Sequence, residues 1–181
     1  MNLLEQAWIP AGEEAGGVRR IPPAALADPA LRRLRSSRAD ISGALTEFLI
    51  GLLQTAFAPE DLDEWLDRLD EPPSPNDLGT AFARFRDAFR LDGPGPRFLQ
   101  DPSAADGKRV GIGQLLIDAP GDNAIRRNLD HFQKRGGVTG LCPGCAAAAL
   151  WTLQAFAPAG GQGHRVSLRG GGPLSTLVVD G

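Results

Sequence analysis

The sequence contains little cysteine, few aromatic side chains and no long apolar run. Its only two cysteines, both in one CxxC, exclude the disulfide framework of a small secreted domain. No stretch approaches the roughly 20 apolar residues of a membrane-spanning helix. Glu5 interrupts the only apolar run near the start that resembles a signal peptide. These absences predict a cytoplasmic protein that makes no contact with a membrane.

Aromatic residues make up 6% of the chain, and tyrosine is absent, whereas hydrophobic residues reach 42%. This composition predicts a globular protein whose core depends on Leu, Ala, Val and Phe. The 23 glycines and 15 prolines indicate that loops form a good part of the structure. A length of 181 residues is sufficient for one ordinary domain with a hydrophobic core.

Charge is distributed unevenly, although the net charge is only −3. Residues 1–120 carry 13 basic and 19 acidic side chains, whereas residues 121–181 carry 6 basic and 3 acidic ones. The pI near 5.4 is far below the value of about 9 that is typical of a free-standing DNA-binding domain. The basic C-terminal part is compatible with one edge that faces nucleic acid. Any binding of nucleic acid would then be confined to this edge or shared with partner proteins.

The first 57 residues predict a hairpin followed by a long helix. Asn2–Pro10 and Val18–Ile21 are two short strands joined by a Gly/Glu turn. A short basic stretch follows at Leu31–Arg38. Apolar residues then recur at helical spacing over Asp40–Phe57, with Asp40 as the N-cap, and we expect this helix to be central.

Two further helices are predicted between the proline-rich loops. The acidic segment Glu60–Asp70 carries one apolar face, and Asn76–Leu91 carries a second stripe that helical spacing assigns to the core. The face of the first helix consists of Leu62, Trp65, Leu66 and Leu69, and the stripe of the second consists of Leu78, Phe82, Phe85 and Phe89.

The rest of the chain is loop-rich and predicts an α+β fold: an N-terminal β-hairpin, a helical core, Gly-rich loops and a short sheet. The predicted elements are an extended piece at Arg97–Gln100, a short helix at Gly113–Asp118, a helix at Cys142–Phe156 and a strand at Leu174–Val179. Pro143 occupies a position that the first turn of a helix accepts. Because the last strand has few possible partners, we expect the chain to be a fragment or its pairing partner to lie elsewhere.

Cys142 and Cys145 allow three interpretations. A CxxC at the start of a helix has the geometry of half a tetrahedral zinc site, which residues beyond 181 would complete. Alternatively, the pair packs as two small buried side chains, or it forms a redox dithiol. The redox interpretation lacks the preceding strand of a βαβ unit. The only histidines, His131 and His164, do not have zinc-finger spacing.

Two loops are candidates for contact with nucleic acid. The glycine-rich segment 159–173 lacks the P-loop and dinucleotide patterns, so it is either a surface connector or a loop whose bare backbone approaches another molecule. The loop 126–137 is either a nucleic-acid contact or a solvated loop with one anchoring Phe. Its basic and aromatic residues are Arg126, Arg127, His131, Phe132, Lys134 and Arg135. We found no catalytic triad or paired carboxylates, and we expect no enzyme activity.

Three segments together resemble the CasA-type large subunit of the type I-E CRISPR Cascade complex. These are NLLEQAWIP at the start, RFLQDP at residues 97–102, and LCPGCAAAALWTLQAFAPAGGQGHRVSLRGGGPLSTLV, which begins at Leu141. The resemblance implies that residues 1–181 are the N-terminal domain, truncated, of such a subunit, and that the C-terminal helical bundle of the family is absent from this sequence.

This resemblance also implies a function and its partners. Subunits of this family act with crRNA and other Cascade subunits to inspect double-stranded target DNA for the protospacer-adjacent motif, and later recruit a helicase–nuclease. The glycine loop of the family corresponds to Gly160, Gly161, Gln162 and Gly163, followed by Arg165. The loop that docks near crRNA and neighbouring subunits corresponds to Phe132, Lys134, Arg135, Gly136 and Gly137. Cys142 and Cys145 correspond to the first half of a four-cysteine zinc site found in some members. The alternative is a small CxxC thiol-redox or zinc-binding protein.

Overall fold

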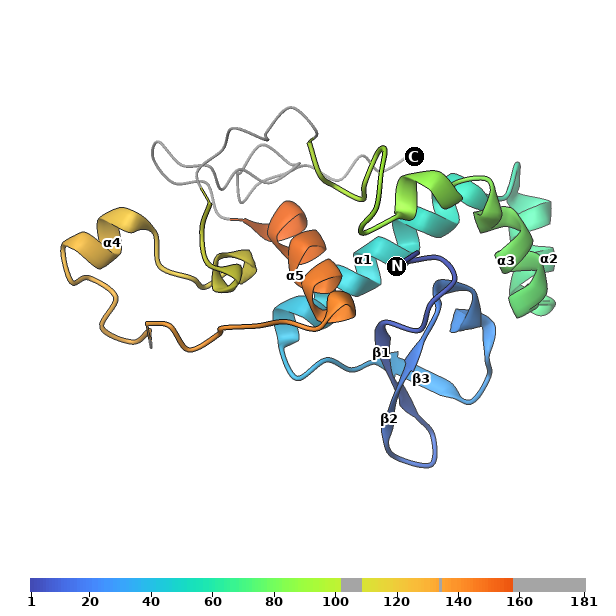
Figure 1. Ribbon diagram of the computed structural model, residues 1–181. Helices are drawn as coiled ribbons and strands as arrows, with labels where there is room; N and C mark the ends of the chain where they lie inside the picture. Colours follow the sequence, from blue (N-terminus) through green and yellow to red (C-terminus); the bar gives the residue numbers. More distant parts are fainter. Residues whose placement is uncertain (102–108, 134, 158–181) are drawn as a thin grey trace. The chain divides into compact units, whose positions relative to one another are not determined.

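The computed structural model describes residues 1–101, 109–133 and 135–157 (Figure 1). The chain divides into two units, Met1–Asp106 and Gly107–Gly181. The first contains a small sheet and the helices α1, α2 and α3, and the second contains α4 and α5. This combination of helices with an antiparallel sheet confirms the predicted α+β class.

The sheet of the first unit has three antiparallel strands in the order β2-β1-β3. They are β1 (Ile9–Glu13), β2 (Val18–Ile21) and β3 (Leu31–Leu34). The predicted hairpin is therefore confirmed, but its first strand begins at Ile9 rather than Asn2 and continues through part of the predicted turn. The sequence did not predict β3, because its two central arginines hide the apolar pattern.

Residues 2–8 form a turn instead of the predicted strand. The Asn2 side chain explains the difference, since its Oδ1 accepts from the Leu4 backbone N–H at 3.0 Å and its Nδ2 donates to the Arg86 carbonyl at 2.8 Å. Trp8 is buried, and its Nε1 donates to the Leu3 carbonyl at 2.7 Å. The opening segment thus joins the start of the chain to residues 86–91.

The long helix α1 (Ala39–Ala56) buries one broad face. Asp40 is not the N-cap, as the sequence predicted. Arg38 has that position, and the Asp40 carboxylate in the first turn accepts from the Arg38 guanidinium at 2.8 and 3.1 Å. A carboxylate is favourable there because it complements the positive end of the helix dipole. The buried residues are Ile41, Ala44, Leu45, Phe48, Leu49, Leu52 and Ala56.

Four aromatic rings, which we call the aromatic cluster, form part of the core of this unit: Trp8, Phe48, Phe89 and Phe98. The Phe48 ring lies at its centre, with ring centroids 5.5 Å from Trp8, 6.0 Å from Phe89 and 6.2 Å from Phe98. All three pairs have the edge-on geometry that aromatic quadrupoles favour.

Phe98 reaches the aromatic cluster from a tight turn, not from the predicted extended piece at Arg97–Gln100. An isolated bridge joins Arg97 to Gln100, and Leu99 has a φ of 50°. The Gln100 side chain holds this turn by donating from Nε2 to the Leu91 carbonyl at 2.7 Å. The RFLQ motif therefore has a structural role, because it inserts its Phe into the core.

The helix α2 (Leu62–Asp70) follows α1 directly (Figure 1). It begins at the N-cap Asp61, whose side chain accepts from the Glu64 backbone N–H at 2.9 Å. The helix thus begins two residues later than predicted. None of its residues is buried, so the predicted apolar face does not join the core.

Helix α3 (Pro75–Ala83) starts with a capping box between Ser74 and Asp77. Leu78 and Phe82 are buried, which confirms their predicted core role. The predicted helix Asn76–Leu91 is interrupted after Ala83, because the chain tightens into the 3-10 helix η2 (Arg86–Phe89). α3 packs against the 3-10 helix η1 (Pro23–Ala27).

Two arginines from later segments complete the C-terminal end of α1. Arg84 donates to the carbonyls of Thr55 at 2.9 Å and Ala56 at 3.0 Å. Arg68 donates to the Phe57 carbonyl and lies 4.2 Å from the centroid of the Phe57 ring. The last carbonyls of a helix lack partners within the helix, so these cations both satisfy them and oppose the negative end of the dipole.

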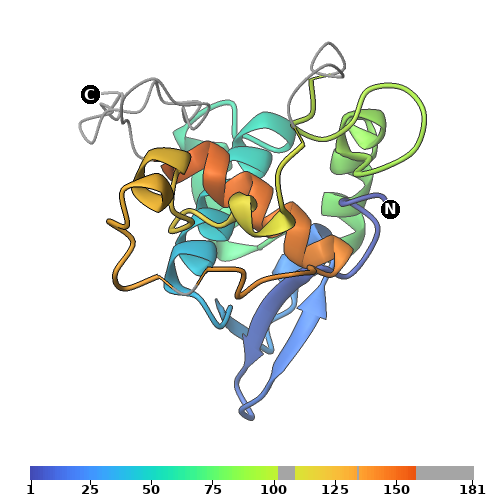
Figure 2. The same ribbon diagram turned by 60° about the vertical axis from the view of Figure 1, so that its left-hand side comes forward.

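The second unit contains the 3-10 helix η4 (Ile112–Leu115), the short α4 (Asp122–Arg126) and α5 (Pro143–Phe156) (Figure 2). α5 confirms the predicted helix, with Pro143 in its first turn. A 3-10 turn replaces the predicted helix at Gly113–Asp118, and the sequence did not predict α4. No helix in the described ranges is long and apolar enough to cross a membrane. The predicted strand Leu174–Val179 lies outside the described residues.

Candidate nucleic-acid interface

The predicted nucleic-acid loop, residues 126–137, starts at the last residue of α4 and folds back on that helix. Asn128 adopts a φ of 51°, a conformation that asparagine tolerates better than most residues. The Leu129 backbone N–H then donates to the Ala124 carbonyl at 2.8 Å, and the Gln133 N–H donates to the Asp130 carbonyl at 3.0 Å. The loop therefore has a defined local path through residue 133.

Arg135 holds this loop closed through an arrangement that we call the Arg135 clamp. Its guanidinium donates to both carboxylate oxygens of Asp130 at 2.6 Å and to Asn128 Oδ1 at 2.8 Å. It also donates to the Ile125 carbonyl at 3.0 Å, which ties residues 128–135 back to α4. Such fork-like pairing of arginine with a carboxylate gives both strength and a fixed geometry.

The clamp changes the electrostatics of the loop. The hydrogen bond from Arg135 lowers the pKa of the Asp130 carboxyl, against the opposing effect of desolvation, and the same bond raises the pKa of Arg135. The Asp130 side chain is only 4% exposed, whereas that of Arg135 is 49% exposed. The Arg135 guanidinium therefore makes its hydrogen bonds to residues of the same loop and to α4. Arg126 and Arg127 are exposed and form no ion pair with another described residue.

Phe132 lies on the part of the loop that the clamp closes. Its side chain is fully exposed, at 102% of the reference area, so the interpretation of an anchoring Phe is wrong. His131 and Gln133 are exposed on either side of it. An exposed aromatic ring on an ordered loop can stack on an unpaired base.

The other residues predicted for this loop are placed only in part. Gly136, with a φ of 67°, turns the chain where most residues would be strained, and Gly137 is exposed beside it. Lys134 lies outside the described residues. Sequence reasoning missed Asp130 and Asn128 as partners of Arg135. The available signal was an Asn and an Asp within seven residues before an arginine, in a loop that otherwise carries only basic charge.

The CxxC motif forms the start of α5. Cys142 is the N-cap, and its Sγ accepts from the Cys145 backbone N–H at 3.1 Å. The two Sγ atoms lie 2.7 Å apart, and no disulfide joins them. Cys142 is exposed and Cys145 is half-buried, so the prediction of two buried packing residues is wrong.

The remaining predicted ligands and contacts stay predictions. Among the residues that the structure places, no group of three or more His, Cys, Asp or Glu side chains is arranged to hold a metal. The second half of the zinc site is therefore a prediction about residues elsewhere. The DNA-contacting segment, Gly160, Gly161, Gln162, Gly163 and Arg165, lies outside the described residues, as does His164.

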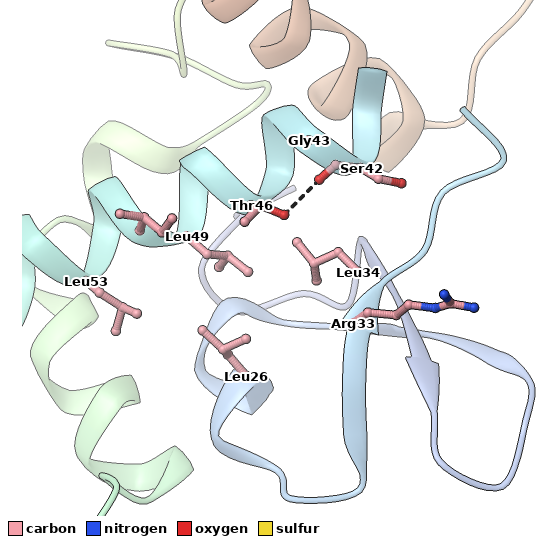
Figure 3. A pocket seen from close by; sticks show the side chains of 9 residues that line it. Leu26, Arg33, Leu34, Ser42, Gly43, Thr46, Leu49 and Leu53 are labelled. Atoms are coloured by element: carbon pink, nitrogen blue, oxygen red, sulfur yellow. Dashed lines mark hydrogen bonds between the residues drawn. The ribbon is translucent and has the colours of Figure 1, made fainter. Parts of the chain in front are cut away.

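The first unit also contains a groove lined mainly by apolar side chains. It encloses about 480 Å³ between α1, β3 and η1 (Figure 3). Leucine side chains point into it, and the Arg33 guanidinium extends away from it (Figure 3). The Thr46 hydroxyl donates to the Ser42 carbonyl at 3.0 Å, and the Ser42 hydroxyl donates to the Arg38 carbonyl at 3.2 Å. The groove is therefore an apolar surface whose hydroxyl groups are bound to helix backbone.

Comparison with known proteins gives a consistent match in sequence and fold. The family model described as CRISPR-associated protein Cse1 matches residues 2–179. Cse1 from Thermobifida fusca is 24% identical with a TM-score of 0.71, and the match covers 88% of this chain and 30% of that protein. CasA (Cse1) from Thermus thermophilus is 24% identical with a TM-score of 0.65, covering 88% and 32%.

A third solved structure, Cse1 from Acidimicrobium ferrooxidans, is 21% identical with a TM-score of 0.65, and the match covers 86% of this chain and 29% of that one. The chain thus spans about a third of the length of these relatives. At this level of identity the structures establish a shared fold, and the family model extends over nearly the whole sequence. The chain therefore belongs to the CRISPR-associated protein Cse1 family.

Proposed function

We propose that this chain is part of a Cascade subunit that helps recognise invading DNA in CRISPR defence, without enzyme activity of its own. The family assignment over residues 2–179 supports this proposal. The subunit acts in the cytoplasm, together with crRNA and the other Cascade subunits. It inspects double-stranded target DNA for the protospacer-adjacent motif and helps to recruit a helicase–nuclease.

The loop 126–137 contacts crRNA or a neighbouring subunit close to it. The single observation that carries this step is the fully exposed Phe132 ring on a loop that the Arg135 clamp closes. The clamp restrains the backbone on either side of Phe132, so less conformational entropy of the loop is lost when the ring stacks on a base. Exposed Arg126 and Arg127 supply charge for phosphate groups, and Lys134, Gly136 and Gly137 complete the docking loop.

The segment Gly160–Gly163, with Arg165 beside it, contacts the target duplex. Bare backbone approaches a groove more closely than larger side chains allow. The minor groove presents a degenerate pattern, which suits a contact that tolerates several related motifs. The family assignment weighs against the alternative of a small CxxC thiol-redox protein, and it leaves zinc binding by a longer chain as a separate proposal.

The proposal is tested in a complex reconstituted from the full-length protein, crRNA and partner subunits. We expect Phe132→Ala to weaken incorporation into the complex by about tenfold, because base–aromatic stacking contributes roughly 1–3 kcal/mol. Leu129→Ala is the matched control, since Leu129 is also exposed on this loop, at 63%. Equal effects of the two substitutions would show that the ring has no specific docking role.

A second pair of variants in the same complex addresses the duplex contact. Gly161→Leu and Gly163→Leu should reduce binding of the target duplex and leave assembly with crRNA unchanged. Gly51→Leu is the control, because a side chain at this exposed position of α1 meets only open space. If both glycine variants bind target DNA like the control, the segment does not contact DNA, whereas the family assignment is unaffected.

A further inference from the structure

The three-stranded sheet turns one face to the core and the other to solvent. Its register pairs Ile9 with Ile21, and both side chains are fully buried, so they lie on the core face. Side chains alternate along a strand, so Arg20 and Arg33, whose partners in β1 are residues 10 and 12, lie on the opposite face. Figure 3 agrees with this placement, because the Arg33 guanidinium extends away from the leucine-lined groove.

Arg35 extends the same face just beyond the end of β3. Its backbone N–H donates to the Pro10 carbonyl at 2.9 Å, which continues the ladder by one residue. A β-carbon at Gly12 would lie 3.5 Å from Arg35 Cδ and 3.7 Å from Arg33 Cγ, so both arginine stems pass over this glycine of the central strand. Arg20, Arg33 and Arg35 therefore share one exposed face of the sheet, which we call the arginine face.

Two guanidiniums of the arginine face keep their charge available. The side chains of Arg33 and Arg35 make no ion pair or hydrogen bond to any residue that the structure describes, whereas the neighbouring Arg32 pairs with Glu14. Within the three strands, Val18 is the only large apolar side chain on this face. Covering the face with apolar protein would bury unpaired cations at high cost, so it stays in water or meets an anion.

Positive charge is concentrated here in an otherwise acidic part of the chain. Residues 18–38 contain six arginines and a single acidic residue, Asp28, whereas the other residues up to position 120 contain 7 basic and 18 acidic side chains. An approaching polyanion is therefore attracted to the arginine face and repelled by most of its surroundings. The basic stretch Leu31–Arg38 thus acquires a position in the fold that the proposed function does not use.

We infer that the arginine face binds the phosphate backbone of a nucleic-acid duplex without reading its sequence. Arg33 and Arg35 lie about 7 Å apart along one strand, and Arg20 lies about 10 Å from Arg35 across the sheet, so the cations form a flat array. Arginine pairs with phosphate through two parallel hydrogen bonds. Within the three strands this face carries no aromatic side chain on which an unpaired base could stack, which favours a duplex over a single strand.

The choice of target DNA as the duplex rests on the proposed function, which brings such a duplex to the same complex. The inference adds a contact surface outside both the loop 126–137 and the segment 160–163. An acidic segment of protein has similar charge, whether it belongs to the same polypeptide or to a neighbouring subunit. The experiment therefore measures the accessibility of these arginines at each stage of assembly.

Arginine footprinting with phenylglyoxal provides this measurement. The reagent modifies accessible guanidiniums, and mass spectrometry reads the modification of Arg33 and Arg35 in three samples: the full-length protein alone, its complex with crRNA and partner subunits, and that complex with a target duplex. We expect both residues to react in the first two samples and at least about fivefold less in the third. Arg97 is the control, because it is exposed elsewhere in the first unit and should react equally with and without DNA.

The three samples separate the possible occupants of the arginine face. Protection in the protein alone would assign the face to the rest of the polypeptide, and protection before DNA is added would assign it to crRNA or a neighbouring subunit; both results overturn the inference. A complex that binds the target duplex without protecting these arginines also overturns it, and leaves the proposed function intact. If the complex binds no target duplex, the proposed function fails instead. The full-length protein with excess duplex of unrelated sequence at low salt then decides the inference, since protection supports it and full reactivity overturns it.

Substitutions provide a quantitative arm in the same complex. Arg33→Gln should lower the affinity for the target duplex about fivefold and the slope of log affinity against log salt by about one. Adding Arg35→Gln should bring these losses to about 25-fold and about two, and they should not depend on the sequence that flanks the target. These side chains are exposed, so melting curves should match those of the unsubstituted protein.

Arg32→Gln is the matched control for Arg33→Gln. It removes the same charge from the same strand, but Arg32 is already paired with Glu14. We expect it to change the affinity less than about twofold. Equal losses from the two substitutions would show that only net charge matters, and would overturn the assignment of a contact to the arginine face.

Discussion

Two regions of this molecule keep their shape by different physical means. The aromatic cluster around Phe48 is held by three buried rings and the half-buried Phe89, whereas the loop 128–135 is held by polar bonds that converge on Arg135. Burial of apolar surface depends little on pH or salt, but a charged clamp depends on both. The comparison teaches that substitutions in the first region affect global stability, and those in the second affect local opening.

The largest expected effect follows from removing the centre of the aromatic cluster. Phe48→Ala leaves a cavity beside Trp8, Phe89 and Phe98, and we expect the free energy of unfolding to fall by about 3–5 kcal/mol. Urea unfolding followed by circular dichroism measures this loss. Phe132→Ala is the control, because its side chain is fully exposed, and we expect a change within about 0.5 kcal/mol. Similar losses for the two variants would mean that the rings around Phe48 do not form the core.

An intermediate effect is expected at the start of α5. Cys142→Ala removes the sulfur that accepts from the Cys145 N–H, and should lower the free energy of unfolding by about 1 kcal/mol. Cys142→Ser keeps an acceptor at the N-cap, and its stability should equal or exceed that of the unsubstituted protein. Unfolding by urea under reducing conditions separates the two variants. Equal stabilities for Ala and Ser would show that the cap contributes nothing.

The smallest change in global stability, with a clear local effect, is expected from the Arg135 clamp. Arg135→Met should increase hydrogen exchange at the Leu129 and Gln133 amides, while the melting temperature changes little. The pKa of Asp130 is lowered in the folded state from its ordinary value of 3.8. The stabilisation is therefore fully present above pH 3.8 and is lost as the pH falls through the lower folded-state pKa.

The pH experiment follows exchange at the same two amides on acidification. We expect faster local opening below pH 3.8 in the unsubstituted protein and no such acid step in Arg135→Met. Arg126→Met is the control, because Arg126 bonds to the neutral Asn123 amide and not to Asp130. An acid step that persists in Arg135→Met would locate the titrating group elsewhere.

Periodicity predicted the positions of the main helices from the sequence, but not their contacts. The pattern over residues 60–70 identified the four apolar side chains of α2. It could not show that Arg68 binds the end of α1 and thereby turns those side chains outward, because that bond joins residues eleven positions apart. The predicted helix ending at Leu91 likewise ignored the tightening after Ala83, which directs Phe89 into the aromatic cluster.

For the candidate interface, composition identified a basic loop but did not predict the intramolecular partners of Arg135. A count of basic residues treats every arginine as available, whereas the structure commits this one to Asp130 and Asn128. The sequence also could not predict the exposure of Phe132. An aromatic residue in a loop can either anchor the loop to the core or remain exposed for contact with another molecule. Likewise, the sequence suggested that Cys142 is a zinc ligand, a packing residue or a redox thiol. It did not predict that Cys142 is the N-cap of α5, because that role depends on backbone geometry.

The three tryptophans give the protein a built-in optical signal. Trp8 is 1% exposed and Trp65 is 50% exposed, with Trp151 between them. Iodide in solution reaches an indole only through its solvent-facing surface, so quenching of the emission arises mainly from Trp65. Intrinsic fluorescence can therefore follow events at α2 without any attached dye, while the emission that iodide does not quench comes mainly from Trp8 and Trp151.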